Sequence, residues 1–218
     1  MKNILLIIFV LSGICSLHAQ TLINCKVDTT GGYISVFDTV KYNPICNYEV
    51  LTKAHLDNHS ANNRDTISFF PHKIDVLYKK SGYSRGHCLP FEDLAYSYVS
   101  AKASMNEKRN LAPQPQNENI GTKLACEDTC RLLANQQGSI QVFGGTWGTY
   151  GSMKGINIPE AYWTMIIDSD NNAICWWLPT HGGKIGYHDL GACRITQESL
   201  EAKLGFEPPL VIFKQQIR

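Results

Sequence analysis

One long helical segment stands in this sequence between two groups of short strand candidates. Residues 120–134 have the apolar spacing of a helix, and Gly138 lies just beyond its predicted end. The strand candidates are residues 33–37 (an edge strand), 48–52, 139–143, 162–167 and 173–178. Because strands and helices do not alternate regularly, the order predicts an α+β domain and not a doubly wound sheet.

The segments between these elements are less regular. Residues 91–105 have helical spacing, and residues 196–204 resemble a short closing helix. Residues 55–65 are polar and rich in turn formers, and residues 111–118 are rich in proline and asparagine, so both are predicted to be loops.

The N-terminus has the pattern of a secretory signal peptide. A basic start is followed by an apolar run from Ile4 to Ile14 and by small Ala19 at the cleavage point. This run is shorter than the roughly 20 residues of a membrane span, and no later segment is apolar enough to be one. We therefore expect a signal peptide at 1–19, one domain at 20–218, and a periplasmic or extracellular location. A lipid anchor at Cys15 is the alternative, although Ile14 stands where such signals have a small residue.

Seven of the eight cysteines follow the predicted signal peptide. In an exported chain this number predicts disulfides, and proximity in sequence favours Cys25–Cys46 and Cys175–Cys193. Cys126 and Cys130 could also belong to a zinc site, but structural zinc normally uses two close pairs of ligands and only one is present.

The net charge of +1 does not indicate a nucleic-acid-binding protein, which usually has a clear basic excess. Any surface that binds phosphate must therefore be local. Positive charge does gather in one stretch, at Lys79, Lys80, Arg85, Lys108, Arg109, Lys123 and Arg131. A solvated surface of mixed charge is the simpler interpretation of composition alone.

Residues that can perform chemistry occur on both sides of the predicted loop at 111–118. Arg85 and His87 project from the same face of a strand because side chains alternate. Asn119 and Glu127 lie within roughly 80° of each other on a continuous helix at about 100° per residue. An amide oxygen and a carboxylate suit Mg²⁺, which prefers oxygen ligands and keeps several waters.

Three separated motifs make this interpretation specific. They are Ser84-Arg85-Gly86-His87, then Asn110-Leu111-Ala112-Pro113-Gln114, then Asn119, Gly121, Glu127 and Arg131. In order and spacing they resemble the DNA/RNA non-specific endonucleases, the ββα-metal (His-Me finger) nucleases that include Serratia nuclease and endonuclease G-like proteins. Weaker similarity extends from about residue 47 to 208. The resemblance implies a ββα-metal core within a mixed, mainly antiparallel sheet-and-helix domain.

The resemblance also implies the role of each residue. His87 would be the general base and Asn119 the direct ligand of Mg²⁺, which Mn²⁺ could replace. Glu127 would hold the metal through water, and Arg85 and Arg131 would bind the scissile phosphate. Asn110 would help to orient this arrangement. The implied substrates are DNA and RNA, cut with little sequence preference because the contacts go to phosphates; a monomer and a homodimer are both open.

Two positions depart from the family pattern. The leading aspartate of the first motif is Ser84 here, which removes a carboxylate beside Arg85 and His87. A tryptophan often found in the third motif is Lys123, which we interpret as a change in packing or as a further phosphate contact. A weakly active or inactive relative that still binds nucleic acid is therefore one alternative.

Two other classes of protein are compatible with parts of the sequence. A cysteine hydrolase could use Cys88 with His87, but neighbouring residues on a strand point to opposite faces. Cys88 is more simply a core thiol or half of a disulfide. A purely structural, disulfide-rich secreted protein is the remaining alternative, and the spacing of the three motifs argues against it.

Overall fold

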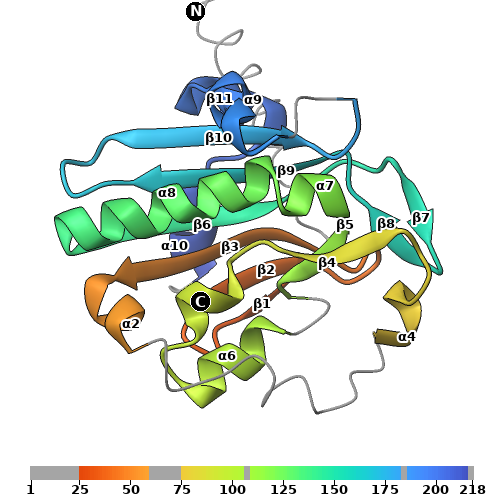
Figure 1. The fold of residues 1–218 in the computed structure, drawn as a ribbon, viewed down its shortest axis with the longest axis horizontal. Helices are drawn as coiled ribbons and strands as arrows, with labels where there is room; N and C mark the ends of the chain where they lie inside the picture. The colour runs from red at the N-terminus through yellow and green to blue at the C-terminus, as the bar shows by residue number, and fades with distance from the viewer. Residues whose placement is uncertain (1–24, 59–74, 106–108, 183–185, 216–218) are drawn as a thin grey trace, which may run out of the picture.

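A seven-stranded antiparallel sheet forms the centre of the molecule (Figure 1). The computed structural model describes residues 25–58, 75–105, 109–182 and 186–215. In spatial order the strands are β1 (Cys25–Asp28), β2 (Ile34–Asp38), β3 (Asn43–Thr52), β6 (Ser139–Trp147), β9 (Ala161–Ile167), β10 (Ala173–Pro179) and β11 (Arg194–Ile195). Two small antiparallel pairs accompany it: β4 (Tyr83–His87) with β5 (Leu111–Pro115), and β7 (Gly151–Met153) with β8 (Ile156–Ile158).

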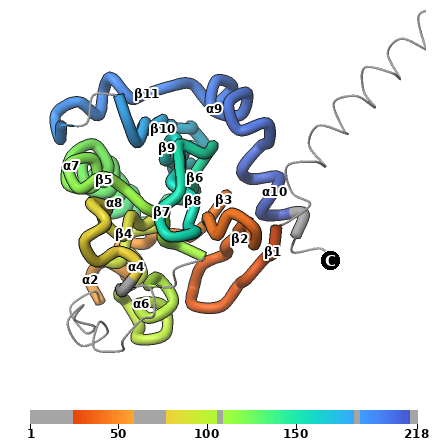
Figure 2. The backbone as a smooth tube through the Cα atoms, turned by 90° about the vertical axis from the view of Figure 1, so that its right-hand side faces the viewer, coloured from red at the N-terminus to blue at the C-terminus, as the bar shows by residue number. Residues whose placement is uncertain are grey.

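Helices cover both faces of the large sheet (Figure 2). The long helix α8 (Thr122–Gln137) crosses one face, and α9 (Gln197–Leu204) and α10 (Pro208–Gln215) cover the other. The remaining helices are short: α2 (Lys53–Asp57), α4 (Asp75–Tyr78), α5 (Phe91–Leu94), α6 (Tyr98–Ser104), α7 (Gln116–Asn119) and the 3₁₀ helix η2 (Tyr187–Cys193). None of the helices described is long and apolar enough to cross a membrane.

Alternation along the strands divides the core into two parts. On β9, Tyr162 and Ile166 face α8, whereas Trp163 and Met165 face α9 and α10. All four side chains are buried, which is why this strand reads as a continuous apolar run. The sheet is therefore the middle layer of the molecule. The candidate active site described below lies on the side of the sheet that α8 covers.

The predicted α+β class is confirmed, and so are most of the central elements. The predicted strands at 48–52, 139–143, 162–167 and 173–178 are present, some of them longer than expected. Helix α8 ends at Gly138, whose φ of 83° suits a residue without a Cβ. Helix α9 begins at Thr196, whose hydroxyl accepts the Ser199 N–H at 3.2 Å.

Several local predictions are wrong. The expected loop at 111–118 is strand β5 followed by α7, because proline is tolerated on a two-stranded ribbon in which an edge needs no N–H donor. The predicted helix at 91–105 is two short helices, since α5 ends at Leu94 and Ser97 caps α6 by accepting the Ser100 N–H. Strand β2 is not the edge of the sheet, because β1 pairs outside it. Helix α9 does not close the chain, because α10 follows it.

Two further segments of the first half also need correction. Lys53–Asp57 is helix α2, where the polar loop at 55–65 was expected to begin. The rest of that loop from 59 onward lies outside the described residues, as does the predicted signal peptide at 1–19.

The predicted disulfides Cys25–Cys46 and Cys175–Cys193 are not formed, and the described residues contain no disulfide. Strand β2 lies between the strands of the first pair, so their backbones are separated by two strand spacings of about 4.8 Å. A disulfide needs Cα atoms within about 6.8 Å. Cys175 and Cys193 belong to the two different parts of the core, on opposite faces of the sheet.

Candidate active site

Arg85 and His87 on the β4–β5 ribbon line a cavity. Gly86, which lies between them, allows the backbone to pack closely on the opposite side of the ribbon. A Cβ on Gly86 would lie 2.5 Å from the Tyr162 hydroxyl and 2.4 Å from Oε1 of Gln114. The backbone can approach these groups only without a side chain. Alternation then directs the side chains of Arg85 and His87 to the opposite, open side of the ribbon.

The chain that follows His87 is held by Asn110, which is fully buried. The side-chain oxygen of Asn110 accepts the Leu89 N–H at 2.9 Å and its amide donates to the Leu89 carbonyl at 2.8 Å. The amide also donates to the Ser104 carbonyl at 2.9 Å, and Asn47 on β3 donates to the Asn110 oxygen. Asn110 is not part of the cavity wall. Asn110 therefore fixes the backbone that follows His87 and lies outside the cavity.

Asn119 and Glu127 are carried by two helices and not by one. Asn119 is the last residue of α7, and Gly121 interrupts the helical path with φ −102° and ψ −113° before α8 begins. The expectation of a shared helical face is therefore wrong, because it assumed continuous rotation from 119 to 127. Both residues nevertheless line the same cavity.

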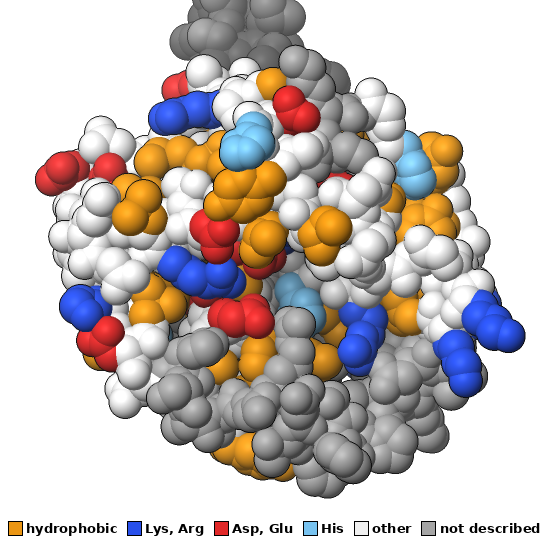
Figure 3. All heavy atoms as spheres, viewed as in Figure 1, with side chains coloured by type: hydrophobic (Ala, Val, Ile, Leu, Met, Phe, Trp, Pro, Cys, Tyr) orange, Lys and Arg blue, Asp and Glu red, His pale blue; other side chains and the backbone are white. Residues whose placement is uncertain are grey.

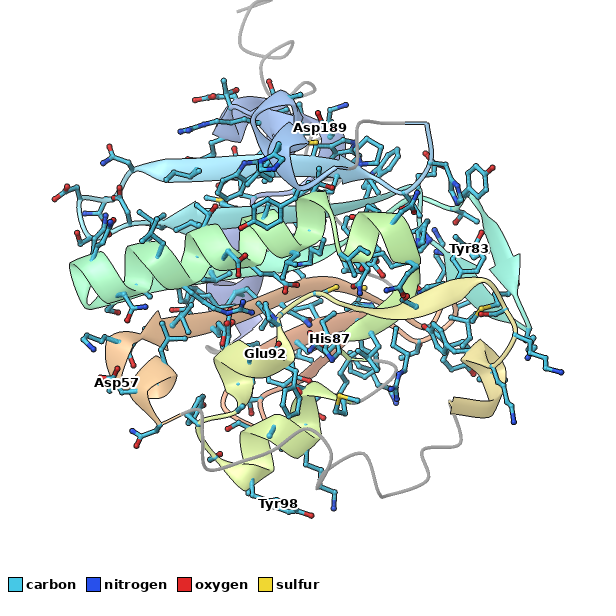
Figure 4. All side chains as sticks on the ribbon, in the orientation of Figure 1. Asp57, Tyr83, His87, Glu92, Tyr98 and Asp189 are labelled. Carbon is cyan, nitrogen blue, oxygen red and sulfur yellow. The ribbon has the colours of Figure 1, made fainter. Side chains whose placement is uncertain are left out.

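This cavity has a volume of about 640 Å³ and brings together most of the residues selected from the sequence. Figure 4 shows His87 and Glu92 on the side of the molecule crossed by α8. The polar and charged residues of the wall are Ser84, Arg85, His87, Glu92, Gln116, Asn119, Glu127 and Arg131. They come from β4, α5, α7 and α8, so the cavity exists only in the folded chain.

Carboxylates surround Arg131 within the cavity wall. Its Nε donates to Oδ1 of Asp93 at 2.7 Å, and its Nη1 donates to Oδ1 of Asp128 at 3.1 Å. Its Nη2 is 3.6 Å from Glu127 and 3.8 Å from Glu92. Burial alone would lower the pKa of Arg131, but Asp93 and Glu127 outweigh it and raise that pKa. Arg131 is thus a firmly held cation of which about a fifth of the side chain is exposed.

Lys123 lies beneath the cavity and is almost completely buried, with 2% of its side chain exposed. Its Nζ donates to the Cys88 carbonyl at 3.3 Å and is 3.5 Å from Oε1 of Glu127. This position is incompatible with the expected contact to a substrate phosphate. The replacement of the family's tryptophan is a change of core packing, in which a buried cation supports Glu127.

Two buried carboxylates near Arg131 were given no role in the site by sequence reasoning. Asp93 is fully buried, and burial raises its pKa to about 7 although Arg131 opposes the shift. Glu49 on β3 is also buried, and burial and the nearby Asp93 raise its pKa well above the ordinary value. A signal for Glu49 existed, because strict alternation places it on the same inward face as Leu51.

Burial and nearby charges both change the pKa of Glu127. Burial raises this pKa, while the positive charges of Lys123 and Arg131 act in the opposite direction. Each of its two oxygens faces one of these cations. An ionised carboxylate at this place is thus supported by two counter-charges, one below it and one beside it.

Ser84 makes a specific contact where the family has a carboxylate. Its hydroxyl donates to Oε1 of Gln116, the first residue of α7. The serine therefore ties β4 to the short helix that ends in Asn119.

The basic stretch seen in the sequence is not a basic surface. Arg109 is buried and donates to Thr30, and it pairs with Asp28 at 3.1 Å. Figure 3 shows acidic and basic side chains interspersed on the face that Figure 1 presents. Among the described residues, the cations at the cavity are chiefly Arg85 and Arg131.

A histidine on a two-stranded ribbon lines one cavity with an amide and a carboxylate on the helices that follow, which is the arrangement expected of a ββα-metal nuclease fold. Comparison with solved structures agrees: the fold is similar to that in the crystal structure of the EndoG/EndoGI complex, with a TM-score of 0.68, 19% identity, and coverage of 82% of this chain and 83% of that chain. The chain belongs to the DNA/RNA non-specific endonuclease family, whose model matches residues 12–208.

Two curated nucleases are similar in sequence. "Nuclease 1, mitochondrial" from Schizosaccharomyces pombe is 34% identical over 128 residues, which is 52% of this chain and 38% of that protein. "Nuclease" from Nostoc sp. is 30% identical over 97 residues, 44% of this chain and 35% of that protein. The matched part therefore spans little more than a third of each relative.

Proposed function

We propose that this protein is an exported, metal-dependent endonuclease that hydrolyses phosphodiester bonds in DNA and RNA with little sequence preference. The observation that carries the proposal is the convergence of Arg85, His87, Asn119, Glu127 and Arg131 on one cavity. These residues come from three separate elements. Membership of the endonuclease family indicates that the reaction at this cavity is phosphodiester hydrolysis.

The residues at the cavity fit a hard divalent cation better than zinc. Asn119 offers an amide oxygen and Glu127 a carboxylate, which are ligands that Mg²⁺ prefers, and an open cavity leaves room for the waters that Mg²⁺ keeps. The part of the chain that the structure describes contains no group of three or more histidine, cysteine or acidic residues able to hold a metal. We therefore propose Mg²⁺, replaceable by Mn²⁺, with Asn119 as its direct ligand and Glu127 acting through water. When bound, the metal supplies positive charge to the phosphate oxygens and the leaving group.

The side chains around the cavity then have distinct tasks. His87 accepts a proton from the attacking water, which requires its neutral form. Arg85 and Arg131 donate to the phosphate oxygens and stabilise the additional negative charge of the transition state. Asp93 holds Arg131 through the 2.7 Å hydrogen bond to Nε, so the guanidinium is already oriented before a substrate arrives. None of these contacts reads a base, which supports cutting without sequence preference.

The proposal is tested by incubating the purified protein with plasmid DNA and with total RNA, in magnesium and in chelator. We expect cleavage of both polymers in magnesium and none in chelator. His87→Ala is expected to reduce the rate at least 100-fold, since general-base catalysis contributes about 10²–10⁴-fold. The matched control is His188→Ala, because His188 is an exposed histidine outside the cavity.

Asn119 can be tested in the same assay. Asn119→Ala is expected to raise the magnesium concentration needed for half-maximal activity, whereas Asn117→Ala, two residues earlier on α7, is not. Full activity of His87→Ala would refute the assignment of the base. Binding of nucleic acid without any cleavage by the unaltered protein would instead identify an inactive relative.

Export is a separate part of the proposal and rests on the apolar run at residues 4–14. We expect the N-terminus of protein recovered outside the cytoplasm to begin near residue 20. Recovery of the uncleaved chain in the cytoplasm alone would contradict it.

A further inference from the structure

A second cavity, of about 520 Å³, lies where strands β6 and β10 end, and four of its nine lining residues are aromatic. Trp147 and Trp177 meet edge to face with ring centroids 5.4 Å apart. Tyr150 stacks on His181 with centroids 3.8 Å apart and an interplanar angle of 22°. Trp147 is 37% exposed and Tyr150 is 58% exposed, so these rings are not core residues that happen to border a space.

The aromatic wall is connected to the active-site cavity by a further ring. Tyr83 lines the active-site cavity, and its ring meets the edge of His181 at a centroid distance of 6.3 Å. Figure 4 shows Tyr83 at the far end of the ribbon from His87, toward β7. Aromatic rings therefore lead from the active-site cavity into the second cavity.

The charges around the second cavity are arranged asymmetrically. The Lys203 ammonium group lies over the Trp177 ring, 5.0 Å from its centroid. Glu160, also in the wall, accepts the Thr149 N–H at 3.3 Å. Flat ring faces beside a single cation match a nucleotide, whose base can stack while its phosphate lies near the lysine.

We propose that the second cavity is a stacking site for unpaired nucleotides of the strand being cut. This inference rests on the proposed nuclease function and adds a substrate preference to it. Bases within a duplex are already stacked on one another, so their faces are not available to Tyr150 or Trp147. The site therefore favours single-stranded DNA and RNA, without distinguishing bases, because every base has a π face.

Equilibrium binding in chelator, where nothing is cut, tests the proposal directly. The anisotropy of a fluorescent single-stranded oligonucleotide is measured beside that of a hairpin duplex of equal length. Tyr150→Ala and Trp147→Ala are each expected to raise the Kd for the single strand about tenfold and to change the Kd for the duplex much less. Tyr98→Ala is the matched control, since Tyr98 is a 45% exposed aromatic residue on α6.

A second measurement separates this proposal from the proposed function. Hydrolysis of a small bis-nitrophenyl phosphodiester in magnesium needs only the active-site cavity, so Tyr150→Ala is expected to leave its rate unchanged. If the unaltered protein hydrolyses no phosphodiester while both aromatic variants lose single-strand binding, the nuclease proposal fails and the stacking site stands.

Two results would overturn the stacking site. One is an unchanged Kd for the single strand in both variants, or an equal loss on the duplex. The other is quenching of tryptophan fluorescence by a neutral oligosaccharide and not by the oligonucleotide, which would identify a carbohydrate site.

Discussion

Replacing Lys123 by methionine separates the two roles that a buried cation next to an active site could have. Methionine keeps most of the volume and length of the side chain and removes its charge. In the structure this deletes the hydrogen bond to the Cys88 carbonyl and leaves Glu127 with Arg131 as its remaining close cation. Breaking a buried ion pair by removing one partner costs about 3–5 kcal/mol. Because Arg131 remains and the Glu127 side chain is 15% exposed, we expect the lower end of this range, about 3 kcal/mol.

The measurement is urea unfolding of four proteins: the unaltered chain, Lys123→Met, Glu127→Gln and the double variant. If the pair is the reason for the loss, the double variant should be more stable than the sum of the single effects predicts, by roughly 1–3 kcal/mol. The reasoning is refuted if Lys123→Met unfolds like the unaltered protein but binds nucleic acid more weakly. That result would assign Lys123 to the substrate phosphate despite its burial.

Three further predictions follow from single contacts. Gly86→Ala should lower the free energy of unfolding by about 1–3 kcal/mol and remove most activity, because the new Cβ meets Tyr162 and Gln114. Thermal unfolding measures the loss, and Gly191→Ala is the control because Gly191 has open space around it. Burial raises the Asp93 pKa from 3.8 to about 7. The stability contributed by the protonated Asp93 carboxyl is therefore present below pH 4 and is lost as the pH rises through 7. The melting temperature should fall across that window, and it should fall less in Asp93→Asn. Ser84→Asp adds a carboxylate to the wall of the cavity that His87 also lines and should move the acidic limb of the rate–pH profile to higher pH, whereas Ser84→Ala should only lower the rate.

The parts of the fold that the sequence predicts well are those in which local pattern and burial agree. Helix α8 and strands β6, β9 and β10 have a consistent periodicity over their length, and their side chains are buried accordingly. Strand β5 could not be predicted in this way. Its two prolines argue against a strand, and only the pairing with β4 across the intervening helices α5 and α6 gives it a partner.

The site shows the same division between local and long-range information. Motif spacing selected Arg85, His87, Asn119, Glu127 and Arg131, and all five line one cavity. Spacing along the chain does not show, however, whether a side chain lines the cavity or is buried beneath it. Lys123 is one turn from Glu127 and Asn110 begins a matching motif, yet both side chains are buried and make contacts inside the protein.

The cations at the cavity are balanced by neighbouring carboxylates. Arg131 is paired with Asp93, Asp128 and Glu127, and Glu127 is paired with Lys123 as well. A phosphate that approaches Arg131 therefore meets carboxylates that already accept hydrogen bonds from its Nε and Nη1. In our proposal Asn119 and Glu127 would hold a divalent cation, which would add the positive charge that attracts the phosphate. Under this proposal the charge that attracts the substrate would belong to the metal-loaded site more than to the polypeptide, which would explain why composition alone does not indicate nucleic-acid binding.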